Sequence, residues 1–331
     1  MRKYTVVGDP HLTHKSLDRG NQLFELVETI GLPAIWKGDF LDTKEVVRGK
    51  CFNALYRYLH TSKLHHIIIV GNHDYFNLDC EDHSLQALKQ LENVTIVDHP
   101  MIIDRMVFFP YIHDRTKLLA AIEKFQGPNR VLFGHLEVSE FDFGNGHICT
   151  SGIHLSALAG FKRVISGHFH KYQESGNLTY IGTPFSHSFG EANQTKYVGM
   201  YDADTDDLKI AETPFPRHIS KEFNCDLMDE NGSHWLFDVE EPQWKNHFYR
   251  IILTGTQANI ERFPRFMYDQ GGTEGKLNIK WITRPSDHAE NNVMIDETVS
   301  NEAQFTKWAS SVRKMDEETV KLGLAILEAC R

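Results

Sequence analysis

Five strand-like segments of this chain each end in a glycine that is followed by polar side chains of metal-ligand types. The segments are residues 3–7, 34–37, 66–70, 130–133 and 163–166, and the motifs after them read GDPH, GDFLD, GNHD, GH and GHFH. A glycine at such a position permits a tight turn and a close approach of the backbone. Loops that leave the carboxyl ends of strands in an α/β fold share one crevice, so we expect the five loops to converge.

The chemistry of the convergent side chains indicates a metal centre. Carboxylate, imidazole and amide ligands together suit Mn, Fe or Zn, and one carboxylate can bridge two ions about 3.5–4 Å apart. Two such ions can neutralise charge on a phosphodiester and activate a water molecule for in-line attack. His73 in GNHD is the candidate that protonates the leaving oxygen. One motif alone is weak evidence, because a single histidine after glycine is more often an ordinary loop residue, but five motifs in order favour the metal site.

The first two thirds of the chain alternate strand-like and amphipathic helical segments. We expect helices at residues 21–30, 52–59 and 85–91, strand-like runs at 101–109 and 180–212, and a hairpin turn near residues 204–207. This pattern predicts an α/β fold over residues 1–215, namely a two-sheet sandwich flanked by helices.

Pro214 and Pro216 interrupt this pattern and indicate a domain boundary. After it we expect a smaller α/β domain at residues 216–284, with strands at 248–253 and 277–282 and a helix at 258–267. Residues 285–331 are expected to form a linker and C-terminal helices whose apolar stripe includes Phe305, Trp308 and Val312. Packing of this stripe on the chain's own core and docking to a partner are equally supported.

Composition is ordinary for a globular protein, but it offers no basic surface for nucleic acid. Lys and Arg number 35 against 45 Asp and Glu, which gives a formal net charge of −10. Since Lys and Arg supply most of the affinity for DNA phosphates, bound cations and a partner protein would have to assist a nuclease. The five scattered cysteines form no C-x-x-C pair, which argues against disulfides and a zinc ribbon. No signal-peptide core and no membrane span is apparent, so we expect a cytoplasmic location.

The five motifs, in this order and spacing, resemble those of the calcineurin-like metallophosphoesterase superfamily over roughly residues 1–215. The resemblance implies two divalent cations and assigns their ligands motif by motif. One cation would be held by Asp9, His11, Asp39 and His170, and the other by Asp39, Asn72, His135 and His168. Asp39 would then bridge the two ions.

Some motif residues differ from those of particular branches of the superfamily, which disfavours a protein phosphatase. Protein phosphatases of the superfamily carry Arg-Gly after the last Asp of the second motif, whereas here Asp42 is followed by Thr43 and Lys44. Those phosphatases also carry Glu after the His of the third motif, where this chain has Asp74. Archaeal and eukaryotic nucleases of the superfamily carry His in place of Asp42. We expect Asp42 to orient a metal ligand without contacting an ion, and Asp74 is a second candidate for this role, for which an ordinary loop role is at least as well supported. His14 and His187 are further near-site candidates, for which ordinary loop roles are equally supported.

The segment VISGHFHKYQ and the later stretches YIGTP and SFGE look like the SbcD nuclease family and the recombination nuclease subunits of tailed phages, relatives of the meiotic recombination eleven nuclease. This resemblance implies an exonuclease and endonuclease of DNA recombination, repair and replication. It implies Mn²⁺ as the cofactor, with Mg²⁺ as the alternative, and an SMC-like ABC ATPase of the SbcC type as partner. Residues 216–284 would be a capping domain and the C-terminal helices would dock the ATPase. A homodimer is a further alternative, and for a phage protein the location would be the host cytoplasm.

Three functions remain open at this stage: the DNA nuclease subunit, a stand-alone small-molecule or cyclic-nucleotide phosphodiesterase, and a non-catalytic binding module. The intact set of seven ligand positions and His73 disfavours the binding module. The long segment after Pro216 disfavours the small-molecule enzyme, while the acidic net charge favours it. Tyr75 and Phe76 have aromatic rings that can stack on bases, but packing within the protein is the better supported role.

Overall fold

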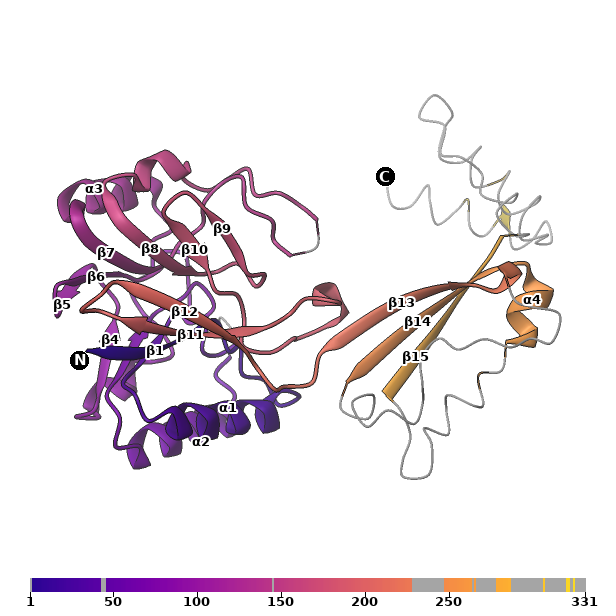
Figure 1. Cartoon of the computed structure of the whole chain (residues 1–331), viewed down its shortest axis with the longest axis horizontal. Coiled ribbons are helices and arrows are strands. Elements are labelled where there is room, and N and C mark those ends of the chain that lie inside the picture. The colour runs from indigo at the N-terminus through magenta and orange to yellow at the C-terminus, as the bar shows by residue number, and fades with distance from the viewer. Residues whose placement is uncertain are drawn as a thin grey trace. The chain divides into compact units, whose positions relative to one another are not determined.

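The computed structural model describes residues 2–42, 46–144, 146–227, 247–263, 265 and 278–286, and the single positions 306, 320, 321 and 324. The chain divides into two compact units, one of Met1–Ile219 with Asn246–Phe248 and one of Ser220–Lys245 with Tyr249–Arg331. Figure 1 shows the elements of both units. The linker and helices expected at residues 285–331 lie outside the described residues, apart from a few single positions.

The first unit contains a six-stranded sheet with the strand order β12-β11-β1-β2-β3-β4 (Figure 1). Its strands are β1 (Lys3–Val7), β2 (Ala34–Trp36), β3 (His66–Ile69), β4 (Val94–Val97), β11 (Tyr197–Asp202) and β12 (Asp207–Glu212). The strands β1 to β4 run parallel, and β11 pairs antiparallel with both β1 and β12. The β11–β12 hairpin turns at residues 203–206, where the sequence predicts a turn.

A second six-stranded sheet has the order β5-β6-β7-β8-β10-β9. Its strands are β5 (Met101–Ile103), β6 (Met106–Phe109), β7 (Gly127–His135), β8 (Phe161–Gly167), β9 (Gln173–Ser175) and β10 (Leu178–Tyr180). The strands β6, β7, β8 and β10 run parallel, while β5 and β9 are antiparallel edge strands. The two sheets confirm the predicted α/β sandwich.

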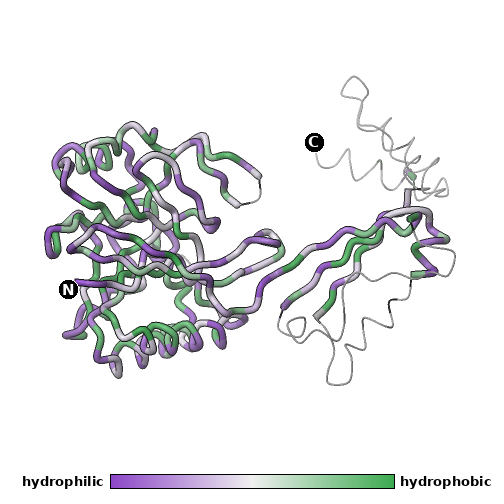
Figure 2. The backbone as a smooth tube through the Cα atoms, in the orientation of Figure 1, coloured by the Kyte–Doolittle hydropathy of each residue, from purple (hydrophilic) through white to green (hydrophobic). Residues whose placement is uncertain are grey.

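Successive side chains of the central strands point to opposite faces of the sheets, and both faces are buried, which gives three hydrophobic clusters. Residues such as Tyr4, Ile67 and Phe133 belong to one cluster that draws on both sheets, so it fills the space between them. The intervening residues of the first sheet, such as Trp36, pack with α1 (Leu17–Ile30) and α2 (Gly49–Thr61). Those of the second sheet, such as Phe109, pack with α3 (Arg115–Phe125). Figure 2 shows hydrophobic residues along the strands and on one side of the helices of this unit.

The helices correct three details of the sequence interpretation. α1 begins before residue 21 and ends at Gly31, whose φ of 70° makes it a left-handed cap. The helix predicted at residues 85–91 is only the 3₁₀ turn η1 (Gln86–Gln90). α3 was not predicted; its N-terminus is capped by Asp114, whose carboxylate accepts hydrogen bonds from the backbone N–H groups of Thr116 and Lys117. Two further 3₁₀ turns are η2 (Leu155–Leu158) and η3 (Phe189–Glu191).

The second unit contains a three-stranded sheet in the order β13-β14-β15. Its elements are β13 (His218–Asn224), the 3₁₀ turn η4 (Cys225–Leu227), β14 (Phe248–Gly255), α4 (Gln257–Arg262) and β15 (Asn278–Pro285). Strands are thus present near residues 248–253 and 277–282, as the sequence predicts. The assignment of residues 216–284 as a capping domain stays a prediction. Within the described ranges, none of the helices is long and apolar enough to cross a bilayer.

Candidate metal centre

The five motifs meet at one edge of the sandwich, although they leave two different sheets. GDPH, GDFLD and GNHD follow β1, β2 and β3 of the first sheet, whereas GH and GHFH lie at the ends of β7 and β8 of the second. Ligand-type atoms within 4.8 Å of one another form three sets: Asp9 with His11 and His170, Asp9 with Asp39 and His135, and His11 with Asp39 and His73. The structure therefore brings together side chains that are far apart in the sequence.

One side of the site is formed by Asp9, His11 and His170, which we call the Asp9 group. The Nε2 atoms of His11 and His170 face each other at 3.0 Å. Asp9 and His11 are buried, and one Asp9 oxygen accepts a hydrogen bond of 2.7 Å from the backbone N–H of His168. Nitrogen atoms of two imidazoles that point at one spot beside a buried carboxylate are the arrangement that a shared cation requires.

The other side is formed by Asn72, His135 and His168, which we call the Asn72 group. The Asn72 Oδ1 atom lies 2.9 Å from both His135 Nε2 and His168 Nδ1. These three ligand-type atoms therefore also point at one spot. The group combines the loop after β3 with the ends of β7 and β8.

Asp39 lies between the two groups. Its Oδ2 atom is 3.5 Å from His11 Nε2 and 3.4 Å from His135 Nε2, so a single carboxylate oxygen is near an imidazole of each group. Its Oδ1 atom accepts a hydrogen bond of 2.7 Å from the backbone N–H of His73. This is the position that a bridging carboxylate would occupy.

Neighbouring acceptors select which imidazole nitrogen faces the centre. The Nδ1 atom of His135 lies 2.7 Å from the carbonyl oxygen of Lys37, which can only accept, so Nδ1 carries a hydrogen and Nε2 is the nitrogen that faces the centre. His170 Nδ1 lies 2.8 Å from a carboxylate oxygen of Glu191, which likewise directs Nε2 inwards. His168 has the reverse orientation, because its Nε2 lies 3.7 Å from Glu137 and its Nδ1 faces Asn72.

The carboxylates and imidazoles of the centre shift one another's pKa values. Burial raises the pKa of Asp39, but the nearby His135, His11 and His73 outweigh it and hold that pKa well below the ordinary range. Burial lowers the pKa of His135, but Asp39 and Asp9 outweigh it and raise the pKa to about 9. A cation bound at these carboxylates would therefore compete with a proton on His135.

Asp74, predicted to orient ligands, joins two of the motif loops. Its carboxylate accepts hydrogen bonds from the backbone N–H groups of Phe40 at 3.0 Å, Leu41 at 3.2 Å and Gly71 at 3.0 Å. Burial, and then the nearby Asp39 carboxylate, raise the pKa of Asp74 to about 7. Asp74 therefore fixes the loop of Asp39 against the loop of Asn72 without reaching either cluster of ligand atoms.

Asp42, the other predicted orienting residue, lies beside His11 with 3.2 Å between its Oδ1 atom and His11 Nδ1. Hydrogen bonding to Asp42 leaves His11 Nε2 for the centre. His187 is half-buried, its ring centroid lies 5.3 Å from that of His11, and desolvation lowers its pKa well below the ordinary value. His14 is exposed in the loop before α1.

The backbone is strained at three of the predicted ligands. His11, Asp39 and His168 have φ values of 41°, 49° and 95°, a region that residues other than glycine rarely adopt. Such strain costs about 1–3 kcal/mol per residue and persists where the surrounding structure imposes it, which is common at functional sites. The preceding glycines also have a packing role: a Cβ on Gly71 would lie 2.2 Å from Asp39 Oδ1, and one on Gly167 would lie 2.4 Å from Asp9 Oδ1.

Four supporting residues were not identified from the sequence. Glu191 is buried, and its carboxylate also forms an ion pair of 2.7 Å with the buried ammonium of Lys196. Glu137 accepts a hydrogen bond from Ser151 and lies near His168. The contact with His168 is the largest of the causes that lower the pKa of Glu137 to about 2. Lys37 is buried, which lowers its pKa to about 8 despite the nearby Asp9. Glu191 lies in the SFGE stretch and Glu137 lies two residues after His135, but neither position shows its contact partner in the sequence.

His73 lies where it can act either as a ligand of the Asp9 group or as a proton donor to a substrate. Its Nδ1 lies 3.4 Å from the carbonyl oxygen of Asp42, and its ring centroid lies 4.8 Å from that of His11. It is half-buried, unlike His11. It therefore borders the Asp9 group as closely as a ligand does, while it is more accessible to a substrate.

The residues present fit divalent cations. The Asp9 Oδ1 atom is buried and has no hydrogen-bond partner in the described structure, which is costly unless a cation satisfies it. Carboxylate, imidazole and amide donors match Mn, Fe or Zn rather than a soft-metal site. A hard cation between these donors would also balance the negative charge of Asp9 and Asp39.

Comparisons with known proteins find relatives among viral proteins. No family model matches the chain. It is 27% identical over 288 residues to exonuclease subunit 1 of Enterobacteria phage T4, an alignment that covers 79% of each protein. It is 30% identical over 206 residues to the putative phosphoesterase 078R of Invertebrate iridescent virus 3, covering 56% of this chain and 58% of that protein. A solved archaeal phosphodiesterase is similar with a TM-score of 0.36 and 16% identity, covering 63% of this chain and 99% of the other.

A two-sheet α/β sandwich with the five motifs gathered at one edge is an arrangement suited to a phosphoesterase that uses metal ions. Together with the two viral relatives, this arrangement supports a hydrolytic phosphoesterase activity for the chain. Its sequence relatives include a phage protein named as an exonuclease subunit.

Proposed function

We propose that this chain is a two-metal-dependent DNA nuclease that hydrolyses phosphodiester bonds as an exonuclease and endonuclease. The observation that carries the proposal is the position of Asp39, whose Oδ2 atom lies within 3.5 Å of one imidazole from each group. Such a centre suits two cations that share one carboxylate, the arrangement used to cleave phosphodiesters. Similarity to a phage exonuclease subunit supports DNA as the substrate.

The proposed ligands follow the two groups. Asp9, His11, Asp39 and His170 would hold one cation, and Asp39, Asn72, His135 and His168 the other. We propose Mn²⁺, with Mg²⁺ as the alternative, because the sets combine imidazole with carboxylate and amide oxygens. Bound there, two divalent cations supply charge neutralisation on the phosphodiester and lower the pKa of an attacking water.

The protein's own groups would perform the proton transfer and the positioning. The Asp42 carbonyl accepts from His73 Nδ1, so His73 Nε2 is the nitrogen that would give a proton to the leaving oxygen. Asp74 holds the loops of Asp39 and Asn72 together. Glu191 and Glu137 keep His170 and His168 in their inward orientations.

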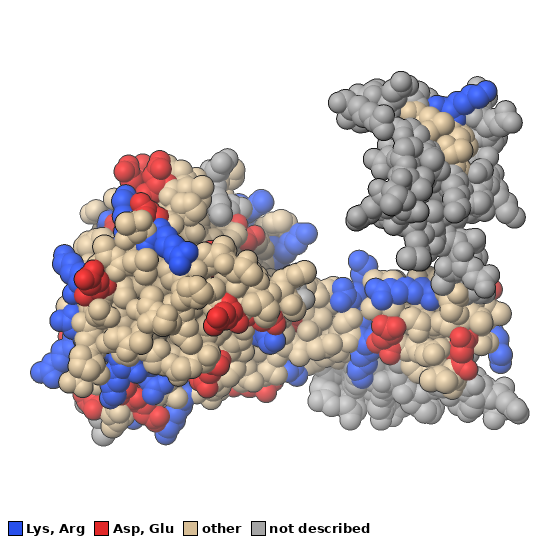
Figure 3. All heavy atoms as spheres, turned by 90° about the horizontal axis from the view of Figure 1, so that it is seen from above, with Lys and Arg blue, Asp and Glu red and all other residues tan. Residues whose placement is uncertain are grey.

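Charge distribution shapes the proposal for DNA binding. On the face of the first unit that Figure 3 shows, Lys and Arg side chains are interspersed with Asp and Glu rather than gathered into a basic stripe. The formal net charge is −10. Phosphate contacts by Lys and Arg dominate DNA affinity, so we propose that a partner supplies much of the binding surface.

We propose that this partner is an SMC-like ABC ATPase of the SbcC type, and that the complex acts in DNA recombination, repair and replication in the cytoplasm. The phage relative is named as a subunit, which supports an assembly. In this proposal residues 216–284 cap the nuclease domain and residues 285–331 dock the ATPase.

The decisive experiment is nucleotide release from linear double-stranded DNA by the purified chain with Mn²⁺, beside the same reaction in EDTA. Release in Mn²⁺ alone is the expected result. Hydrolysis of a small phosphodiester without release from DNA, with or without the ATPase, would favour the stand-alone small-molecule phosphodiesterase, which the acidic net charge also suits.

A further inference from the structure

Two hollows lie on either side of Tyr111 and reach the candidate metal centre. One, of about 270 Å³, is lined by His135 as well as Tyr111. The other, of about 390 Å³, is lined by Asn72 as well as Tyr111. Each hollow therefore includes a member of the Asn72 group, and Tyr111 is the wall that they share. Both volumes are near the lower end of ligand sites, about 300–1,000 Å³, which is room for a single ring system and not for a duplex.

The hollow beside Asn72 is mainly aromatic and apolar. Tyr75, Phe76 and Leu78 line it with Tyr111, and the amides of Asn72 and Asn77 supply the polar groups. Phe76 is 38% exposed and Leu78 is 61% exposed, although both are large hydrophobic side chains. Apolar side chains left accessible beside a polar centre indicate a binding surface.

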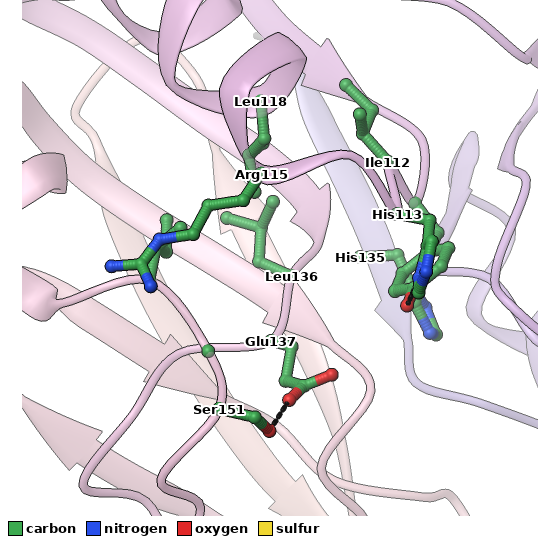
Figure 4. A pocket seen from close by; sticks show the side chains of 11 residues that line it. Ile112, His113, Arg115, Leu118, His135, Leu136, Glu137 and Ser151 are labelled. Carbon is green, nitrogen blue, oxygen red and sulfur yellow. Dashed lines mark hydrogen bonds between the residues drawn. The ribbon is translucent and has the colours of Figure 1, made fainter.

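The hollow beside His135 has an apolar floor and a polar rim. Figure 4 shows Leu136 in its middle, with Arg115 on one side and the hydrogen-bonded pair Glu137 and Ser151 on the other. Buried Leu118 and Ile153 complete the floor. A flat ring could lie on this floor while its edge meets the charged and hydroxyl groups of the rim.

Tyr111 links the hollows to the site of hydrolysis. Its ring stacks on that of His168, with centroids 6.0 Å apart and planes inclined by 21°, and it meets the His135 ring edge-on at 6.1 Å. Its backbone N–H donates to the carbonyl oxygen of Val70 at 2.8 Å, which fixes it beside the GNHD motif. A ring stacked against Tyr111 would thus be adjacent to a phosphate held at the centre.

We propose that the two hollows bind unpaired nucleobases of the DNA strand next to the scissile phosphate, with Tyr111 and Phe76 as stacking surfaces. The inference rests on the proposed nuclease function and adds the recognition of bases to it. Aromatic side chains suit every base, because each base has a π face, so the expected site prefers single-stranded over paired nucleotides without reading sequence.

The test measures binding of a short single-stranded phosphorothioate oligonucleotide to the full Mn²⁺-loaded chain by fluorescence anisotropy. Tyr111→Leu should weaken binding about tenfold, the scale of one lost stacking contact, whereas Tyr111→Phe should retain it. Tyr56→Leu is the matched control, because Tyr56 is an exposed aromatic residue on α2, 39% accessible, that lines neither hollow. Circular dichroism and Mn²⁺ titration establish that each variant is folded and loaded. If Tyr111→Leu fails there, Phe76→Leu replaces it, with a smaller loss expected.

An abasic oligonucleotide makes the test specific for bases. Removing the bases should weaken binding to the unmodified chain and have little further effect on Tyr111→Leu. Equal affinity of the unmodified chain for both oligonucleotides would overturn this inference, even if the chain releases nucleotides from DNA. Conversely, base-dependent binding through Tyr111 without hydrolysis of any DNA would overturn the proposed nuclease function and leave the base site standing.

Discussion

The two sides of the candidate centre are built differently. The Asp9 group is enclosed by charged supports: Asp42 contacts His11, and Glu191 with buried Lys196 supports His170. The Asn72 group instead borders the two hollows at Tyr111. If both groups hold cations as proposed, the Asp9 group is supported by charged side chains, whereas the Asn72 group would also face a substrate.

The supports also differ in strength. His170 Nδ1 lies 2.8 Å from Glu191, a hydrogen-bond distance, and both Glu191 and Lys196 are buried. His168 Nε2 lies 3.7 Å from Glu137, which is only partly buried and also accepts a hydrogen bond from Ser151. A firm carboxylate–imidazole contact orients a ligand more tightly than a loose one, so the Asp9 group should bind its cation more tightly.

The largest expected effect comes from Asp39, because its loss should affect the Asp9 group and the Asn72 group alike. Asp39→Ala should remove both cations and reduce hydrolysis to background, because one carboxylate serves both groups. Elemental analysis of the purified variant measures the metal content. Asp98→Ala is a suitable control, since Asp98 is a carboxylate paired with Lys89 and lies outside both groups. Metal content equal to that of the unmodified chain would contradict the bridging position of Asp39.

His73 should separate metal binding from turnover. His73→Ala should retain both cations and slow hydrolysis about 100-fold or more, the usual scale for a lost general acid. Metal content and steady-state kinetics on the same preparation decide the matter. Loss of a cation would make His73 a ligand of the Asp9 group, as its distance to His11 and Asp39 permits. Unchanged turnover would exclude it from the mechanism.

The motifs revealed the centre because each places ligand and glycine within a few residues. A glycine such as Gly71 is required where a Cβ would meet Asp39, and that requirement is visible as a local sequence pattern. The alternation of strand-like and helical segments likewise predicted the sandwich, since strands packed on both faces are continuous apolar runs in the sequence. The metal roles of these residues stay predictions.

The supports and the hollows could not be predicted in the same way. Glu191 and His170 meet through the packing of η3 against the GHFH loop, and no spacing in the sequence records that contact. α3 was missed because its apolar face is narrow, with only Leu118 and Ile122 buried, so tertiary packing rather than periodicity defines it. Arg115, which lines one of the hollows, is the first residue of this helix.

The pH dependence of cation binding should reflect His135. Its raised pKa of about 9 means that the ion pair with Asp39 stabilises the metal-free chain fully below about pH 6.5 and is lost as the pH rises through about 9. A cation needs the neutral imidazole, so Mn²⁺ affinity should rise with pH by up to about tenfold per unit for each proton displaced. Titration calorimetry at pH 7, 8 and 9 checks this. Affinity that levels off at pH 7, as for an ordinary histidine, would count against the raised pKa.

The smallest effects should come from the supporting carboxylates, and they test the comparison directly. Glu191→Gln and Glu137→Gln each keep the side-chain shape and remove the charge, so each should weaken cation binding roughly 10- to 100-fold, the range for a lost supporting contact. Two-site Mn²⁺ titration should show Glu191→Gln acting on the tighter site and by the larger factor, because its contact with His170 is the shorter one. If both variants weaken the same site, or Glu137→Gln has the larger effect, then the two sides of the centre do not differ as their supports indicate.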